Sequence, residues 1–181
     1  MIFGVVLAGG IESRMGNVDK PKQYLLVGEK PIIIHTLERF YVQNEFEKII
    51  VLCPEEWVSH TKNLIKKYMK DTDRIVVLRG GDTRNETIMN SLRYIEKEYG
   101  LDDDTIVVTH DSVRPFVTQR IIEENIKYAK EYGACDTAVA ATDTIVYSQD
   151  NVLISDIPDR SKMYQGQTPQ TFNALKLKNL Y

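Results

Sequence analysis

Two glycines and two cations near the start of the chain form the arrangement that most clearly suggests chemistry. Gly9 and Gly10 follow the apolar run Ile2–Leu7, and Arg14 and Lys22 come shortly after them. A loop with so little side chain lets the backbone approach a ligand closely and offers N–H groups to an anion such as phosphate. The two cations could stabilise a phosphoryl group in transfer, a reaction that depends on positioning and charge complementarity. The stretch predicts a polyphosphate cradle; the simpler alternative is a tight turn with solvated charges.

Two later loops, at 80–87 and 110–116, also carry glycine or charge. The first, with its two leading glycines, could let a nucleobase or ribose rest against bare backbone, and Arg84 and Arg114 are candidate anion contacts. Asp111 could hold Mg²⁺ bridged to phosphates, because Mg²⁺ prefers few protein ligands together with phosphate oxygens. The alternatives are a surface ion pair for each arginine and, for the aspartate, a hydrogen bond to its own backbone.

Three other chemistries do not fit the sequence. Residues 110–112 read His-Asp-Ser, but sequence neighbours do not make a catalytic triad, and no Gly-x-Ser-x-Gly elbow is present. His60 has no partner at metal-ligand spacing, so we expect no zinc site. Gly9-Gly10-x-Glu12 is not the Gly-x-Gly-x-x-Gly fingerprint, and no acidic residue ends the strand near Cys53, which disfavours a dehydrogenase.

The elements that must position these loops alternate regularly between strand and helix. Apolar runs predict strands at 2–7, 48–53, 74–79, 105–109 and 134–141. Helices are predicted to open near Pro31, at Pro54, after the 80–87 loop and after a capping Thr118. This alternation predicts an α/β fold, a Rossmann-like, mostly parallel sheet with helices on both faces. The three loops would then meet at the carboxyl edge of the sheet, where such folds bind ligands.

The pattern changes after the fifth strand. Residues 144–147 and 152–154 flank a turn-rich group, which predicts a β-hairpin arm that leaves the main sheet. The 181 residues suffice for one domain, which we take as 1–181 with 142–160 as a protruding arm. A net charge of −3 argues against nucleic-acid or membrane partners, and two cysteines in apolar runs together with the absence of a signal peptide indicate a cytoplasmic protein.

Six motifs in order make the chain resemble the IspD/TarI-type cytidylyltransferases, which join a sugar-alcohol phosphate to CTP. The motifs are Leu7–Gly10, Ser13–Gly16, Pro21–Gln23, Gly80–Asp82 with Arg84, His110-Asp111-x-x-Arg114-Pro115 and Gln167–Gln170. Within that group, residues 85–90 and 164–167 look most like ribitol-5-phosphate cytidylyltransferase of teichoic acid and cell wall biosynthesis. The close relative uses 2-C-methyl-D-erythritol 4-phosphate in isoprenoid biosynthesis.

The resemblance implies a nucleotidyltransferase that makes CDP-ribitol and pyrophosphate from CTP and D-ribitol 5-phosphate with Mg²⁺. Arg14 and Lys22 would be catalytic, and Asp111 would hold the metal. Asp111, Arg114 and Arg160 would bind the acceptor, with Arg160 acting across a homodimer in the neighbouring site. The implied CTP-binding residues are Leu7, Ala8, Gly9, Gly10, Gly81, Asp82, Arg84 and Thr87.

Two departures from the family pattern motivate alternatives. Glu12 stands where the family usually has glycine, and the family continues for several dozen residues past Tyr181, so we expect a C-terminus that is truncated relative to the family. The alternatives are a 2-C-methyl-D-erythritol 4-phosphate cytidylyltransferase and a nucleotide-binding homologue without catalysis.

Overall fold

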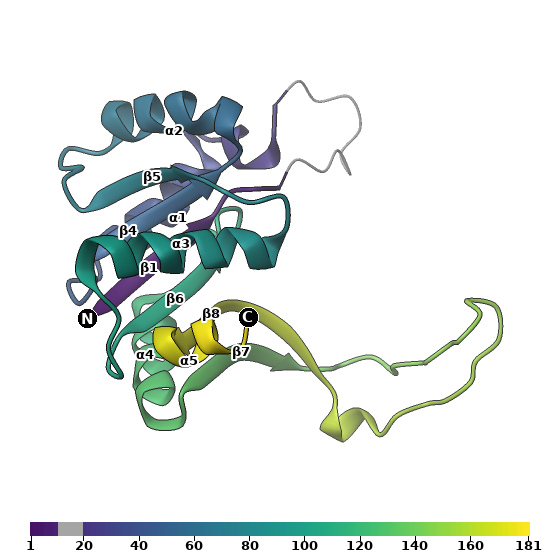
Figure 1. Ribbon diagram of the computed structural model, residues 1–181. Coiled ribbons are helices and arrows are strands. Elements are labelled where there is room, and N and C mark those ends of the chain that lie inside the picture. Colours follow the sequence, from purple (N-terminus) through teal and green to yellow (C-terminus); the bar gives the residue numbers. More distant parts are fainter. Residues whose placement is uncertain (11–19) are drawn as a thin grey trace.

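A six-stranded sheet with the strand order β5-β4-β1-β6-β8-β7 forms the centre of the protein (Figure 1). The structure is a computed structural model that describes residues 1–10 and 20–181; Glu12 and the predicted catalytic Arg14 lie outside the described residues. The strands are β1 (Ile2–Leu7), β4 (Lys48–Cys53), β5 (Ile75–Arg79), β6 (Ile106–Asp111), β7 (Ala134–Ala140) and β8 (Tyr164–Asn173).

Parallel pairing dominates this sheet. β1 pairs in parallel with β4 and β6, and β4 pairs in parallel with β5. β8 is antiparallel to both of its neighbours, β6 and β7. The sheet confirms the predicted Rossmann-like α/β fold. β8 is an addition to the predicted strands, because residues 167–170 stand out in the sequence as a motif and not as part of a strand.

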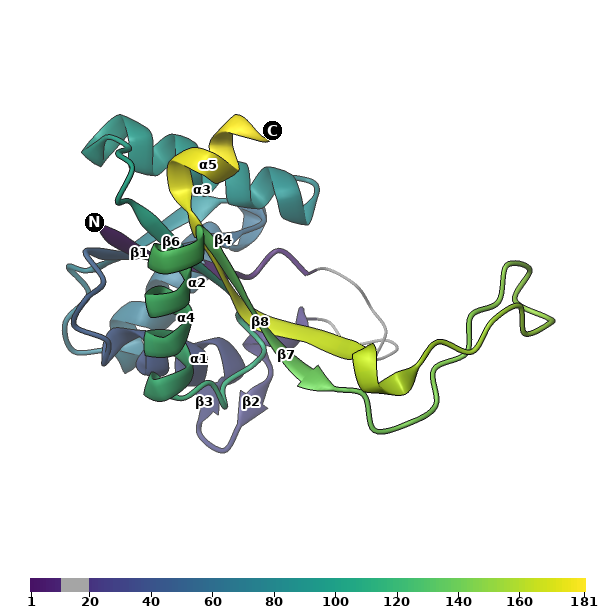
Figure 2. The same ribbon diagram turned by 90° about the horizontal axis from the view of Figure 1, so that it is seen from below.

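Helices cover both faces of the sheet, as Figure 2 shows edge-on. One face carries α1 (Ile32–Tyr41), α2 (Glu55–Tyr68) and α4 (Gln119–Tyr132), and the other carries α3 (Arg84–Tyr99) and α5 (Ala174–Asn179). α1 and α2 each begin directly after a proline, whose restricted φ suits a helix entry. The predicted cap Thr118 accepts a hydrogen bond from the N–H of Ile121 at the start of α4.

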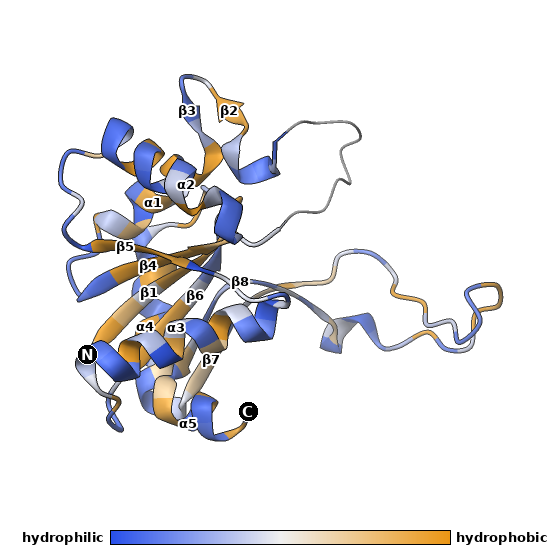
Figure 3. Cartoon of the chain, turned by 45° about the horizontal axis from the view of Figure 1, so that its top comes forward, coloured by the Kyte–Doolittle hydropathy of each residue, from blue (hydrophilic) through white to orange (hydrophobic). Residues whose placement is uncertain are grey.

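The apolar core is divided by the sheet into two layers. β1 alternates between them, so that Phe3 and Val5 pack with α3 while Ile2 and Val6 pack on the α1 side. Figure 3 shows the hydrophobic colour concentrated along the central strands. Gly4 occupies the position on the α1 side where the Phe40 ring lies against the strand. The missing side chain therefore makes room for an aromatic pair, Phe40 stacked on Phe46 at 5.3 Å between ring centroids.

The segment between β7 and β8 leaves the sheet and extends away from the body of the protein (Figure 1). The hairpin predicted at 144–147 and 152–154 does not form as two strands: the backbone makes one isolated antiparallel bridge, Tyr147 with Asp156, and a short 3₁₀ turn at Arg160–Lys162. Asp150 explains the difference, because its carboxylate accepts the N–H groups of Val152 and Leu153 and curls the tip into a loop. The predicted excursion is present with a different local structure.

Two smaller features complete the fold. A 3₁₀ turn (η1, Lys22–Tyr24) leads into the two-residue strands β2 (Leu26–Val27) and β3 (Lys30–Pro31), which pair with each other.

Both cysteines are free thiols. Within the described ranges, no helix combines the length and apolarity needed to cross a lipid bilayer.

Replacing Gly4 with alanine is expected to lower the free energy of unfolding by about 1–3 kcal/mol, the usual cost of overpacking a core. A Cβ at this position would lie 2.8 Å from Cδ1 of Phe40. Urea denaturation measures the change, with Gly10→Ala as the control because a Cβ there meets nothing within 4 Å. A Gly4→Ala protein within about 0.5 kcal/mol of the parent would contradict this packing.

Candidate active site

A cavity of about 460 Å³ opens at the carboxyl ends of β1 and β6, next to the start of α3. The three loops that the sequence analysis singled out all contribute to it. Its walls are Leu7, Gly9, Gly10, Lys22, Gln23, Gly81, Asp82, Thr83, Arg84, Thr87, Asp111, Ser112 and Val113. The parallel sheet therefore brings together residues that are up to about a hundred positions apart in the chain, as expected for ligand sites in such folds.

The first loop offers bare backbone to the cavity. Ala8 is buried and its N–H donates to the carbonyl of Leu52 at 2.8 Å, which extends the sheet by one more residue. A Cβ on Gly9 would come no closer than 4.0 Å to another atom, and one on Gly10 would meet nothing within 4 Å. Packing within the described protein therefore does not require glycine here, whereas a ligand lying against the main chain would.

The second loop is shaped by its own side chains. The Thr83 hydroxyl caps α3 by accepting the N–H of Glu86, and the Glu86 carboxylate accepts the N–H of Asp82 at 2.8 Å. A Cβ on Gly81 would clash with the Glu86 side chain. The buried Thr87 hydroxyl accepts the N–H of Gly81 at 3.0 Å, so it holds the loop closed beneath the cavity. Gly81 and Thr87, both predicted to bind CTP, thus also stabilise the conformation of this loop.

The third loop centres on a carboxylate held between two guanidinium groups. Asp111 Oδ1 accepts from Arg84 Nη1 at 2.6 Å, and its Oδ2 accepts from Arg114 Nε at 2.9 Å. Each arginine also donates to a glutamine of β8: Arg84 to Gln170 at 3.1 Å and Arg114 to Gln167 at 2.6 Å. Asp111 and its two arginines together join α3, β6 and β8 beside the cavity.

The charge of Asp111 follows from these neighbours. Its partial burial acts to raise its pKa, but the hydrogen bonds and positive charges of Arg84 and Arg114 outweigh that effect and hold the pKa below its ordinary value of 3.8. The carboxylate is therefore ionised near neutral pH. The cluster carries two positive charges for one negative charge, so it favours an anionic ligand.

The donor set at the cavity fits a magnesium ion that arrives with phosphates. The described residues contain no group of three or more His, Cys, Asp or Glu that could bind a metal by themselves. They do place the ionised Asp111 and the carboxylate-bearing Asp82 on the cavity wall. Each Asp111 oxygen accepts one arginine bond and keeps a further lone pair. One or two carboxylates completed by substrate phosphates and water are what Mg²⁺ prefers.

His110 lies buried directly beneath this loop. Its ring stacks on Phe40 with 5.3 Å between centroids, and its Nε2 lies 3.0 Å from the carbonyl oxygen of Arg114. Because a carbonyl only accepts, Nε2 carries the proton, and the buried Nδ1 has no partner among the described residues. Burial lowers the pKa of His110 below 6.5, although the bond to the Arg114 carbonyl acts in the opposite direction.

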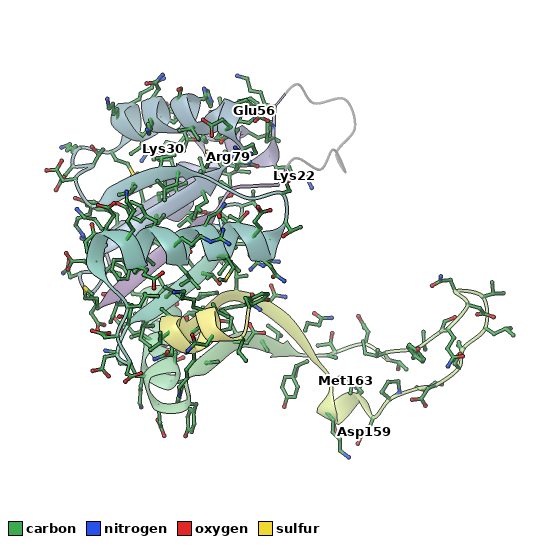
Figure 4. The ribbon with its side chains drawn as sticks, in the orientation of Figure 1. Lys22, Lys30, Glu56, Arg79, Asp159 and Met163 are labelled. Atoms are coloured by element: carbon green, nitrogen blue, oxygen red, sulfur yellow. The ribbon has the colours of Figure 1, made fainter. Side chains whose placement is uncertain are left out.

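Among the predicted site residues that the structure describes, three do not line the cavity. Ala8 lies beneath the first loop, and Arg114 reaches the site only through its bond to Asp111. Arg160 lies in the extended segment, where its Nη1 donates to the carbonyl of Thr142 at 2.9 Å. Figure 4 shows the neighbouring Asp159 out along this segment, while Lys22 lies at the rim of the body.

Sequence reasoning gave no role to several residues that the structure places at the site. Gln167 and Gln170 were recognised only as part of a motif, and their bonds to Arg114 and Arg84 depend on β8 lying beside β6. Gln23 likewise stands out in the sequence only as the last residue of the Pro-Lys-Gln motif. The sequence signal for such a role is a polar residue next to a candidate cation. The hydrogen-bond partner of that polar residue can be identified only from the fold.

Comparison with known proteins finds matches that cover nearly the whole chain. The model of the family described as IspD, 2-C-methyl-D-erythritol 4-phosphate cytidylyltransferase, matches residues 2–181. The chain is similar to 4-diphosphocytidyl-2C-methyl-D-erythritol synthase of Anaerococcus prevotii DSM 20548, with a TM-score of 0.80 and 26% identity over 99% of this chain and 73% of that one. It is also similar to 2-C-methyl-D-erythritol 4-phosphate cytidylyltransferase of Francisella tularensis, with a TM-score of 0.76 and 28% identity over 98% and 75% of the two chains.

His110 makes the stability of the protein depend on pH in a defined direction. The unfolded imidazole takes up a proton near its ordinary pKa of 6.5, while the folded one does so only at lower pH. The free energy of unfolding should therefore fall as the pH drops from about 7 to about 5, and His110→Gln should flatten this slope.

Thermal or urea unfolding at several pH values measures this effect. His60→Gln is the matched control: this second imidazole also has a pKa lowered by burial but is more exposed, so most of the slope should remain. An unchanged slope in His110→Gln would show that the buried imidazole is not its source.

Proposed function

We propose, because the chain belongs to the IspD family of cytidylyltransferases, that it transfers the cytidylyl group of CTP to 2-C-methyl-D-erythritol 4-phosphate and releases pyrophosphate. The observation that supports this most is the family match over nearly the whole chain. The cavity agrees with it, because it has bare backbone on one side and a cationic cluster on the other. This acceptor replaces the ribitol phosphate that we placed first from the sequence motifs.

The cavity suggests how its residues would divide the work. The N–H groups of Gly9 and Gly10 would receive the triphosphate, and the loop at Gly81–Thr87 would receive the cytidine. Lys22, on the cavity wall, would neutralise the charge that develops on the phosphate during transfer. Arg114, held by Asp111 just outside the cavity wall, would lie near the acceptor.

The reaction itself needs no covalent enzyme intermediate. A phosphate oxygen of the acceptor attacks the α-phosphorus of CTP; the new P–O bond forms as the bond from that phosphorus to the β-phosphate oxygen breaks, and its electron pair leaves with pyrophosphate. A magnesium ion held by Asp111 and the phosphates would stabilise charge on the leaving group. The protein supplies position and electrostatics, so Lys22 and the cationic cluster matter more than any proton-transfer residue.

We also propose that two copies exchange the extended segment at 142–160, so that Arg160 serves the partner's site. The segment carries apolar side chains that are more than half exposed, Val152 at 82%, Leu153 at 68% and Ile154 at 62%. Such a group on an excursion from the body is a typical protein-contact surface. The absence of Arg160 from the cavity of its own chain fits this arrangement.

The acceptor is tested by measuring pyrophosphate release with CTP, Mg²⁺ and each of two acceptors. We expect kcat/KM for 2-C-methyl-D-erythritol 4-phosphate to exceed that for D-ribitol 5-phosphate by at least about tenfold, because pocket hydrogen bonds discriminate between hydroxyl patterns. A preference for ribitol phosphate, which the motifs at 85–90 and 164–167 favour, would overturn the acceptor but not the reaction. CTP binding by calorimetry without turnover of either acceptor would instead indicate a non-catalytic homologue.

The exchanged segment is tested by mixing two inactive variants. Lys22→Ala and Arg160→Ala should each lose orders of magnitude in turnover. After subunit exchange, mixed dimers would contain one intact site, and about a quarter of the parent activity should return. Sedimentation velocity checks that each variant is still dimeric, and a mixture that stays inactive would contradict the exchange.

A further inference from the structure

We propose that Gln23 is a positioning residue that, together with Tyr24, holds Lys22 at a fixed place beside the Gly9-Gly10 loop. This inference rests on the proposed function, in which Lys22 stabilises the transferring phosphate. It assigns a role in the reaction to two buried residues that follow Lys22 in the chain.

The local backbone places Lys22 and Gln23 on the cavity wall, with the Gln23 side chain buried, and Tyr24 in the interior. Pro21 precedes the turn with φ −56° and ψ 147°, and the N–H of Tyr24 donates to its carbonyl at 3.0 Å. The tight 3₁₀ turn brings Lys22 to the cavity wall next to Gln23, which is only 2% exposed, and Tyr24 is 4% exposed behind them. Lys22 is thus followed by two anchors.

Gln23 is the anchor toward the first loop. Its side-chain Nε2 donates a buried hydrogen bond of 2.7 Å to the carbonyl of Ala8. Ala8 immediately precedes Gly9, and its own N–H donates to Leu52 in β4. One side chain therefore ties the Lys22 segment to the last sheet-bonded residue before the two glycines. The bond fixes the position of the Lys22 backbone relative to the N–H groups of the glycine loop.

Tyr24 is the anchor toward α2. Its ring stacks on Trp57 with 4.8 Å between centroids, and its hydroxyl lies 2.8 Å from Thr61 Oγ1. The single hydroxyl hydrogen of Thr61 is directed to the carbonyl of Trp57 at 2.8 Å, so Tyr24 is the donor in their bond. This bond fixes the far side of the turn against a helix that packs on the sheet core.

Two fixed points matter because the lysine stem is long and rotatable. A displacement of about 1 Å at a group that stabilises the transition state can cost about a hundredfold in rate. Loss of the Gln23 bond also leaves the Ala8 carbonyl buried without that partner, which would shift the loop. The effect of Gln23 should therefore reach the reaction through Lys22 and not through the fold as a whole.

A double-mutant cycle tests this route. Gln23→Met keeps the length of the side chain, removes the donor and adds no charge near a triphosphate. We expect it to lower kcat by about 10- to 100-fold in the parent but by less than about threefold in the Lys22→Ala background. Gln43→Met, at another buried glutamine, which follows the C-terminal end of α1 and does not line the cavity, is the matched control and should leave kcat unchanged.

A second, milder variant distinguishes an effect on Lys22 from a folding defect. Tyr24→Phe keeps the stacking on Trp57 and removes only the hydroxyl bond, so it should lower kcat in the same direction by a smaller factor, again only when Lys22 is present. Circular dichroism melts confirm folding. Equal losses with and without Lys22, or no loss in either variant, would overturn the proposal.

The same cycle in CTP affinity, measured by calorimetry, separates this proposal from the proposed function. A parent protein without cytidylyl transfer would refute the function, while coupled losses of CTP affinity would still support the anchoring of Lys22 by Gln23. An active parent with additive losses would refute the anchoring alone.

Discussion

The direction of the strands is the constraint on which the rest of the structure depends. Because β1, β4, β5 and β6 run in parallel, their carboxyl ends reach one edge of the sheet, and the chain must leave each strand there. The glycine loop after β1, the loop before α3 and Asp111 at the end of β6 therefore meet without any of them being close in sequence. Chemistry at this edge follows from topology before any individual side chain is considered.

Electrostatics then gives this edge its preference for anions. The Asp111 carboxylate has an arginine on each oxygen, and each arginine is oriented by a glutamine of β8. The guanidinium groups are held in place before a ligand arrives, so an anionic ligand would bind with little reorganisation. The antiparallel strand β8 thus contributes to the site, although its side chains are not on the cavity wall.

Sequence reasoning predicted the parts of the fold that local pattern encodes. The apolar runs of the parallel strands and the Thr118 cap are local signals, and the structure confirms them. β8 was missed because Gly166 and Pro169 interrupt a polar segment whose pairing partners lie far away in sequence. The hairpin was wrong in detail because Asp150 captures backbone N–H groups that a regular ladder would use. Most residues that line the cavity could be predicted from motifs in the sequence. The hydrogen bonds that orient them could not, because those bonds depend on the tertiary fold.

We propose that bare backbone and the Lys22 segment at the sheet edge bind a cytidine triphosphate. A crystal structure of the protein with CTP and Mg²⁺ would locate the nucleotide. We expect the triphosphate over Gly9 and Gly10 within reach of Lys22, with the cytosine against the loop at Gly81–Thr87. A nucleotide bound elsewhere, with its phosphates away from Lys22, would contradict this proposal.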